Sequence, residues 1–191
     1  MRKRIILFST LLCFTGFLAE LATAQAAGNV YFGYTYYNTD LSLNRGSLNG
    51  WQGTLEGKIF PYVGVVADIT GHYGNLNFPA PVPVQPVGGG GGSSATSVST
   101  SAHVYESMFG PRVGIPIGKF RPFAEFEVGV GHVNTNGFGS DTSFATAIGG
   151  GLDYKIIRPI AWRFQGDYIH TSFFSNGQNN LRLSTGIVLR F

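Results

Sequence analysis

This 191-residue sequence contains a single cysteine, Cys13, which lies close to the N-terminus. No disulfide can therefore form within the chain. Residues 1–24 have the three regions of a secretory signal peptide, with basic residues 2–4, an apolar run over 5–18 and small residues before two A-x-A sites. Cleavage after Ala24 or Ala26 removes the cysteine. An exported chain without cysteine cannot be cross-linked by disulfides, so burial and backbone pairing must stabilise it.

Long apolar runs and charge are also scarce. A membrane-spanning helix needs about 20 apolar residues, and the run over 5–18 is shorter, with none longer downstream. Charged residues make up 12% of the chain, against roughly 25% in soluble domains. The 13 bases and 10 acids include Arg2, Lys3, Arg4 and Glu20. Their removal leaves 10 bases and 9 acids, or about +1, and nucleic-acid binding loses its compositional support.

Glycine and aromatic residues are abundant, and they fall into segments with an alternating apolar and polar pattern. This period-2 pattern is typical of β-strands. Eight segments are expected over residues 29–38, 48–59, 63–73, 103–113, 120–133, 142–154, 160–170 and 181–191. The connections between them alternate long and short. The longest, at about 74–102, is rich in Pro, Gly and Ser and is predicted to be a disordered loop on the outer side.

In these segments, every second position forms a polar set that contains charged residues together with glycine and alanine. Such small residues beside charges suit the crowded lumen of a barrel, whereas a surface in contact with water has no need of them. We call this set the polar phase and the alternate set the apolar phase. Buried charges need partners, and here seven acids share one phase with bases of opposite sign. We therefore predict an ion network in the lumen. Its members are Glu56, Lys58, Asp68, Glu106, Arg112, Glu125, Glu127, Asp153, Arg163, Asp167, Arg182 and Arg190.

The apolar phase is predicted to face lipid. Aromatic residues gather near both ends of the segments, as in the two interfacial girdles of transmembrane barrels. A soluble lipocalin-like barrel also alternates, but it does not account for glycine and charge on the polar phase. Side chains fill the interior of a barrel of eight strands, which argues against a general porin.

The last residues, Ile187-Val188-Leu189-Arg190-Phe191, end a strand on an aromatic, and only Val188 breaks the alternation. With the signal peptide and the eight segments, this ending resembles the small OmpA/OmpX-like outer-membrane β-barrel family over the whole segment 27–191. The resemblance implies an all-β, eight-stranded antiparallel up-and-down transmembrane barrel, exported to the outer membrane. It also implies an assembly signal read by the barrel-assembly machinery, formed by Leu183, Thr185, Ile187, Leu189 and Phe191. Thr185 departs from the family pattern, where a large apolar residue is usual.

Four histidines, His72, His103, His132 and His170, fall at the outer ends of strands, but only His72 has the lumen phase. Metal ligands must converge, so we expect no metal site. No phosphate loop is present either, because the glycine runs are followed by neither a helix nor a phosphate-binding lysine. We expect no cofactor.

His170-Thr171-Ser172 resembles the His-x-Ser pair of lipid A deacylase barrels, where an acid orients the base for a serine nucleophile. The following strand, 178–191, contains no Asp or Glu, so that arrangement is incomplete and no catalytic residue is assigned. The leading hypothesis is a non-enzymatic, monomeric outer-membrane protein with a structural or surface-interaction role, in contact with membrane lipid and lipopolysaccharide. A lipid-modifying barrel enzyme and a narrow gated channel are the alternatives.

Overall fold

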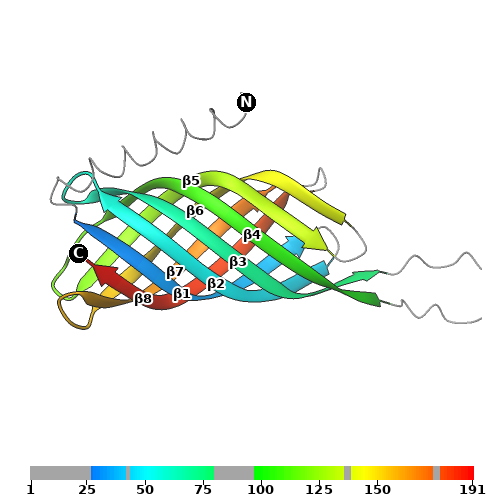
Figure 1. Cartoon of the computed structure of the whole chain (residues 1–191), viewed down its shortest axis with the longest axis horizontal. Coiled ribbons are helices and arrows are strands. Elements are labelled where there is room, and N and C mark those ends of the chain that lie inside the picture. Colours follow the sequence, from blue (N-terminus) through cyan, green and yellow to red (C-terminus); the bar gives the residue numbers. More distant parts are fainter. Residues whose placement is uncertain (1–26, 42–43, 80–96, 136–138, 174–176) are drawn as a thin grey trace, which may run out of the picture.

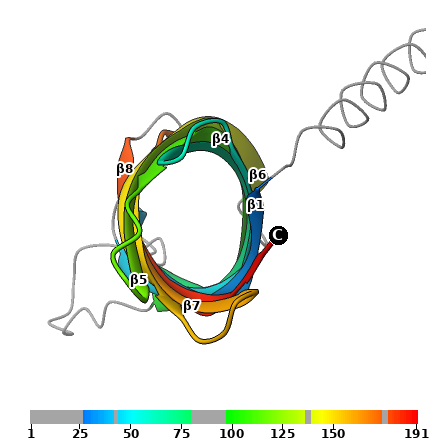
Figure 2. The ribbon, with the colours of Figure 1, turned by 90° about the vertical axis from the view of Figure 1, so that its left-hand side faces the viewer.

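The alternating segments of the sequence become the strands of one closed antiparallel sheet in the computed structural model, which describes residues 27–41, 44–79, 97–135, 139–173 and 177–191 (Figure 1). The strands are β1 (Gly28–Leu41), β2 (Asn44–Lys58), β3 (Val63–Pro79), β4 (Ser97–Gly114), β5 (Phe120–Thr135), β6 (Gly139–Lys155), β7 (Ile160–Thr171) and β8 (Gln178–Arg190). The view along the axis shows the closed ring (Figure 2). The predicted eight-stranded up-and-down barrel is confirmed.

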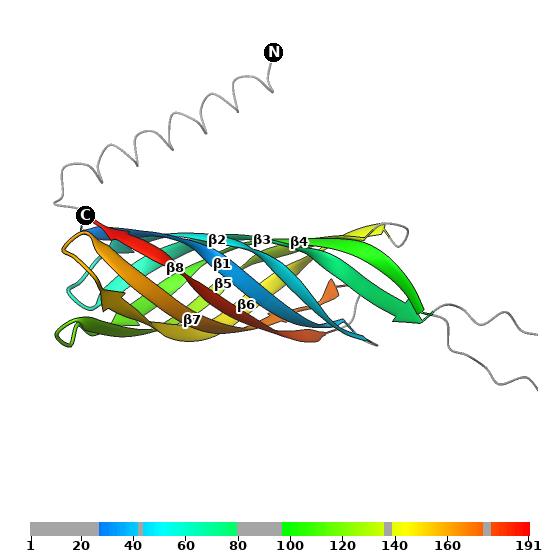
Figure 3. The ribbon, with the colours of Figure 1, turned by 90° about the horizontal axis from the view of Figure 1, so that it is seen from below.

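The first and last strands close the barrel. They run side by side (Figure 3), with Val30 opposite Leu189 and Asn29 opposite Arg190. The pairing continues past β8, because the Gly28 amide donates to the Phe191 carbonyl at 2.9 Å and the Phe191 amide donates to the Gly28 carbonyl at 3.1 Å. This pairing joins the first and last strands, so the sheet closes into a ring along the wall of the barrel.

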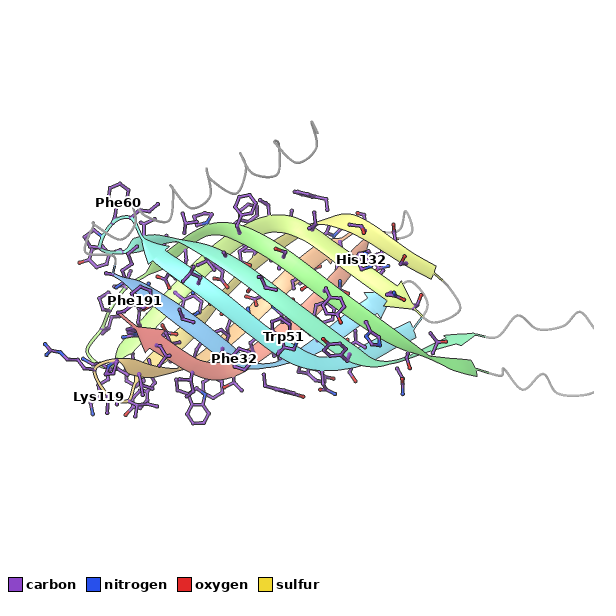
Figure 4. All side chains as sticks on the ribbon, in the orientation of Figure 1. Phe32, Trp51, Phe60, Lys119, His132 and Phe191 are labelled. Atoms are coloured by element: carbon purple, nitrogen blue, oxygen red, sulfur yellow. The ribbon has the colours of Figure 1, made fainter. Side chains whose placement is uncertain are left out.

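Side chains alternate between the two faces of the sheet, and the outer face is apolar. Along β5 the residues are exposed and buried in turn over most of the strand. Phe32 of β1 is 66% exposed and Phe144 of β6 is 64% exposed, whereas Asp153 of β6 is completely buried. Figure 4 shows Phe32 and Trp51 on the outer wall. A continuous apolar exterior around a polar interior is the arrangement of a barrel that faces lipid.

The strands extend further than the sequence predicts. Residues 74–79 of β3 pair with residues 97–102 of β4, within the expected loop of 74–102, and residues 80–96 lie outside the described part. The connections expected near 40–47 and 134–141 are likewise mostly strand. A membrane-crossing strand needs about 9–11 residues. Beyond that length the outer face need not be apolar, so the alternating signal fades while backbone pairing continues.

The two ends of the barrel differ. Three tight turns, over 59–62, 115–119 and 156–159, join strands at what we name the turn end, where Phe191 also lies. Gly118 has a φ of 62° in the second turn, a conformation that favours glycine. The opposite end, which we name the loop end, includes the long β3–β4 hairpin (Figure 1). No helix in the described residues is long and apolar enough to cross a membrane. The predicted signal peptide, with its two cleavage sites, lies outside the described residues.

Candidate functional site

Charged side chains from β2 to β8 fill the lumen, and they form the candidate site. Most members of the predicted network are buried there. The buried members are Glu56, Asp68, Glu106, Arg112, Glu125, Glu127, Asp153, Arg163, Asp167 and Arg182. Arg190 also reaches the network, with 24% of its side chain exposed.

Glu56 of β2 organises the part of the network near the turn end. Its carboxylate accepts hydrogen bonds from Arg121 Nη2 at 2.5 Å, from Arg112 Nη1 at 3.2 Å and from Asn29 Nδ2 at 2.9 Å. Arg112 also donates through Nε to Glu125 at 2.6 Å. These contacts link four strands across the lumen, and charge-assisted bonds are the stronger class of hydrogen bond.

Asp153 of β6 joins the same cluster from the other side of the lumen. Arg163 Nε donates to it at 2.7 Å, and Arg190 Nη2 donates to it at 3.3 Å. The Phe123 ring lies between two guanidinium groups, with Arg112 Cζ at 4.5 Å and Arg163 Cζ at 4.6 Å from its centroid. Cation–π contacts of this kind gain strength away from water. We name the charged residues of this region the Glu56 cluster.

A second cluster surrounds Arg182 of β8, which is completely buried. Four carboxyl groups from four strands surround this one guanidinium. The ion-pair distances to it are 2.8 Å from Asp167, 3.2 Å from Asp68, 3.6 Å from Glu106 and 4.0 Å from Glu127. We name these five residues the Arg182 cluster. The positive charge of Arg182 therefore offsets part of the repulsion among four buried acids.

Neutral polar residues complete the Arg182 cluster. Glu106 accepts hydrogen bonds from the Tyr37 hydroxyl at 2.8 Å and from Thr70 Oγ1 at 3.1 Å, and Gln52 donates to Asp68. The His72 ring packs on Tyr37, with centroids 4.4 Å apart. The cluster is thus ordered by hydrogen bonds as well as by charge.

An apolar layer lies above the Arg182 cluster, toward the loop end. It is made of buried residues whose side chains meet inside the barrel: Tyr37, Leu48, Ala102, Val104, Met108, Val133, Ala145, Ala147, Ile169 and Phe173. With the two charged clusters below it, this layer fills the lumen of the described barrel. This is the side-chain-filled interior that is expected of a barrel of eight strands.

Glycines make room for the network, as the sequence predicts. A side chain at Gly149 would meet the Asp167 carboxylate, and one at Gly131 would come within 2.9 Å of the Phe173 ring. A side chain at Gly114 would come within 2.8 Å of the Arg121 guanidinium. A side chain at Gly151 would come within 2.7 Å of the Phe123 ring. Bulkier residues at these positions would collide with charged or aromatic side chains of the lumen.

The structure corrects the predicted network in two places. Lys58 is exposed at the end of β2 and makes no ion pair within the described residues, because its position is past the buried part of the strand. Its place at the turn end is taken by Arg121, which the sequence analysis missed. Arg121 and Glu125 are four residues apart and so have the same phase. The alternation of this segment therefore already indicated that Arg121 faces the lumen. Glu125 pairs with Arg112 of the neighbouring β4.

The lumen also contains aromatic residues that the sequence analysis missed. Tyr31, Tyr37 and Phe123 are buried, although aromatics were expected on the outer face. Tyr31 packs with Ala161 and Val188 in a small apolar cluster. This contact explains why Val188 breaks the alternation of β8, since an apolar residue is needed at that point of the lumen.

The histidines lie as their phase predicts. His72 is buried, whereas His103, His132 and His170 are exposed, and Figure 4 shows His132 near the loop end. In the part of the chain that the structure describes, no group of three His, Cys, Asp or Glu residues could hold a metal ion.

Within the described residues, the His-x-Ser pair lacks the hydrogen bonds of a catalytic dyad. His170 Nδ1 is 2.8 Å from the Asn179 side-chain oxygen, so an amide occupies the place where a catalytic acid would orient the ring. The Ser172 amide donates to Ser143 Oγ at 2.8 Å, and no hydrogen bond joins Ser172 to His170 within the described residues. A serine nucleophile needs a base within hydrogen-bond reach.

The predicted assembly-signal residues share the outer face of β8. Leu183, Ile187, Leu189 and Phe191 are exposed. Thr185, the departure from the family pattern, accepts a hydrogen bond from Trp162 Nε1 at 2.7 Å and donates to the Arg163 carbonyl at 3.1 Å. The Thr185 hydroxyl on this apolar face therefore finds its hydrogen-bond partners on the neighbouring strand β7.

Comparison with known proteins supports the fold. No family model and no curated protein matches the chain. Among solved structures, Neisserial surface protein A is similar at 13% identity, with 86% of this chain and 97% of that chain covered and a TM-score of 0.65. OprG from Pseudomonas aeruginosa is similar at 10% identity, with 87% and 96% covered and a TM-score of 0.60. The attachment invasion locus protein Ail of Yersinia pestis, solved with a heparin analogue, is similar at 12% identity, with 86% and 99% covered and a TM-score of 0.54. The chain therefore has the fold of the small eight-stranded outer-membrane β-barrels that the sequence predicts.

Proposed function

We propose that this protein is a non-enzymatic integral protein of the bacterial outer membrane that contributes to envelope integrity or surface contacts through its loop end. One observation carries the proposal: the apolar outer wall, including Phe32, Phe144 and Ile148, surrounds a lumen filled by side chains. Such a wall needs lipid around it. The filled lumen leaves the ends of the barrel as the surfaces available for contacts.

The long β3–β4 hairpin favours the loop end as the contact surface. Its strands contain 17 and 18 residues and extend beyond the length that crosses a membrane. An extended sheet carries its paired backbone beyond the lipid surface. With the turn end in the periplasm, as in outer-membrane barrels with short periplasmic turns, this hairpin stands outside the cell.

The proposed partners are the lipids of the membrane, lipopolysaccharide and, during biogenesis, the barrel-assembly machinery, and the mature protein acts as a monomer. A lipid-modifying enzyme is less well supported, because Asn179 and not an acid contacts His170. A gated channel is less well supported, because Arg112, Arg163 and Arg182 are inaccessible to water.

Fractionation and gel mobility test the proposal. Expressed with its N-terminal segment, the protein should accumulate in the outer membrane, and unboiled samples should migrate differently from boiled ones on a denaturing gel. Identical migration would contradict a compact barrel. Stepwise conductance in planar bilayers would favour the channel, and lipid hydrolysis lost in Ser172→Ala would favour the enzyme.

A further inference from the structure

The turn end of the barrel combines exposed cations with exposed apolar side chains. Lys58, Lys119 and Arg158 are exposed, and Lys155 is half-exposed. Each tight turn contains apolar residues beside one of these cations. These residues are Ile59, Phe60, Tyr62, Ile115, Ile117, Ile156 and Ile157, and each is more than half exposed. Figure 4 shows Phe60, Lys119 and Phe191 at this end of the molecule.

The tight turns hold the apolar side chains outside the lumen. Ile59 and Phe60 donate backbone hydrogen bonds to the Val63 carbonyl at 3.0 Å, and Ile117 donates to the Phe120 carbonyl at 2.7 Å. The third turn closes in the same way, with Ile156 donating to Ile160 at 3.0 Å. Turns closed so tightly cannot fold inward to bury their side chains, so these residues need an apolar environment outside the barrel.

The charged side chains exposed at this end are all cationic. The nearby acids of the described part, Glu56 and Asp153, are completely buried and paired with arginines. The three lysines of the described residues all lie at the turn end. The exposed cations therefore have no acidic side chain to neutralise them on the described surface around the turns.

We propose that the turn end binds the anionic phospholipid headgroups of the leaflet that it enters. The isoleucines and aromatics of the turns continue the apolar wall into the interface, as shown by Leu55, Val65 and Val113, which are exposed on the adjoining strands. Lysine and arginine extend their apolar stems along such a surface and place the charge among the phosphates. An acidic protein partner would not need the continuous apolar surface that joins the turns to the wall.

The inference rests on the proposed membrane location, and the native tryptophans allow both to be tested. The chain has two tryptophans, and Trp162 lies on the outer face of β7, two residues after its start at the turn end. In a Trp51→Phe background, Trp162 reports on nearby lipid. The barrel is folded into phosphatidylcholine vesicles that contain brominated phosphatidylglycerol or, in matched samples, the same amount of brominated phosphatidylcholine.

Stronger quenching by brominated phosphatidylglycerol is expected, and it should weaken at high salt. The variant K58Q/K119Q/K155Q should reduce the preference for phosphatidylglycerol by about five-fold or more, because each cation near an anionic membrane surface strengthens the attraction to it. Arg45 lies at the opposite end of β2 from Lys58, so Arg45→Gln should leave the preference unchanged. Boiled and unboiled gel samples verify that every variant is inserted.

Equal quenching by the two lipids in an inserted barrel would overturn this inference alone. A barrel that fails to insert would overturn it together with the membrane location. A preference that survives in K58Q/K119Q/K155Q would also overturn the inference, because the lipid would then bind elsewhere on the wall.

Discussion

Arg121 of β5 donates two hydrogen bonds to the carboxylate of Glu56 on β2, from Nη2 to Oε1 at 2.5 Å and from Nη1 to Oε2 at 3.1 Å. The two residues are 65 positions apart in the chain, and their strands are not neighbours in the sheet. The pair therefore ties opposite parts of the barrel wall together through the lumen. Bidentate geometry of this kind adds specificity as well as energy.

Removing the Glu56 carboxylate should destabilise the barrel strongly. Glu56→Gln leaves Arg112 and Arg121 buried without their shared acid, and loss of one buried partner costs about 3–5 kcal/mol. Urea unfolding in detergent or vesicles measures the change. Lys58→Gln, two residues later but exposed, should change the free energy of unfolding by less than about 0.5 kcal/mol. Equal effects of the two variants would mean that the Glu56 cluster does not contribute to stability.

Removing the Arg182 guanidinium should have a comparable cost, because four carboxyl groups lose their common counter-charge. Arg182→Gln should lower the free energy of unfolding by about 3–5 kcal/mol, seen as a smaller fraction of heat-modifiable protein on gels. The double variant R182Q/D167N should recover part of this loss. Arg190→Gln removes one partly exposed ion pair and should cost about 1 kcal/mol or less. A double variant no better than R182Q would contradict the charge argument.

A methyl group at Gly149 should disturb the network without changing any charge. It would collide with the Asp167 carboxylate, which holds Arg182. Overpacking of this kind costs about 1–3 kcal/mol, so Gly149→Ala should lower the denaturant midpoint. Gly57→Ala is the matched control, because nothing lies within 4 Å of a side chain there. The prediction fails if both alanines leave the midpoint unchanged.

The position of the membrane can be tested with single arginines on the outer wall. Ile148→Arg places a charge in the middle of β6, where the cost should be about 2–4 kcal/mol, whereas Ile157→Arg at the turn end should cost about 0–1 kcal/mol. Both isoleucines are more than half exposed in the isolated barrel. In water, an arginine would therefore be tolerated equally well at the two positions. Unfolding in vesicles gives the two values, and a cost at Ile157 equal to that at Ile148 would place the turns inside the hydrocarbon.

Phe191 should matter more for assembly than for synthesis or export. Its backbone pairs with Gly28 at the seam, and its side chain is 65% exposed. Deletion removes both contributions, while Phe191→Ala removes the side chain alone. We expect outer-membrane accumulation to fall in both variants, more in the deletion. Phe120→Ala, another exposed aromatic at this end, serves as the control. Normal accumulation of the deletion variant would refute the role in assembly.

The sequence alone determines the number and order of the strands and the face to which most residues belong. These properties are local, because alternation has a period of two residues and each strand pairs with its sequence neighbour. The same logic places His72 inside and three histidines outside. It also places Arg182 in the lumen and Leu189 on the wall.

The tertiary structure decides which charges meet and where the strands stop. Partners across the lumen, such as Arg121 with Glu56 or Arg182 with Asp68, depend on the tilt and stagger of strands far apart in the chain, which alternation does not encode. The ends of β3 and β4 lie beyond the apolar wall, where pairing continues without a hydrophobic signal. Lys58 has the lumen phase but lies past the buried part of β2, so only the structure separates it from the network and places it among the cations of the turn end.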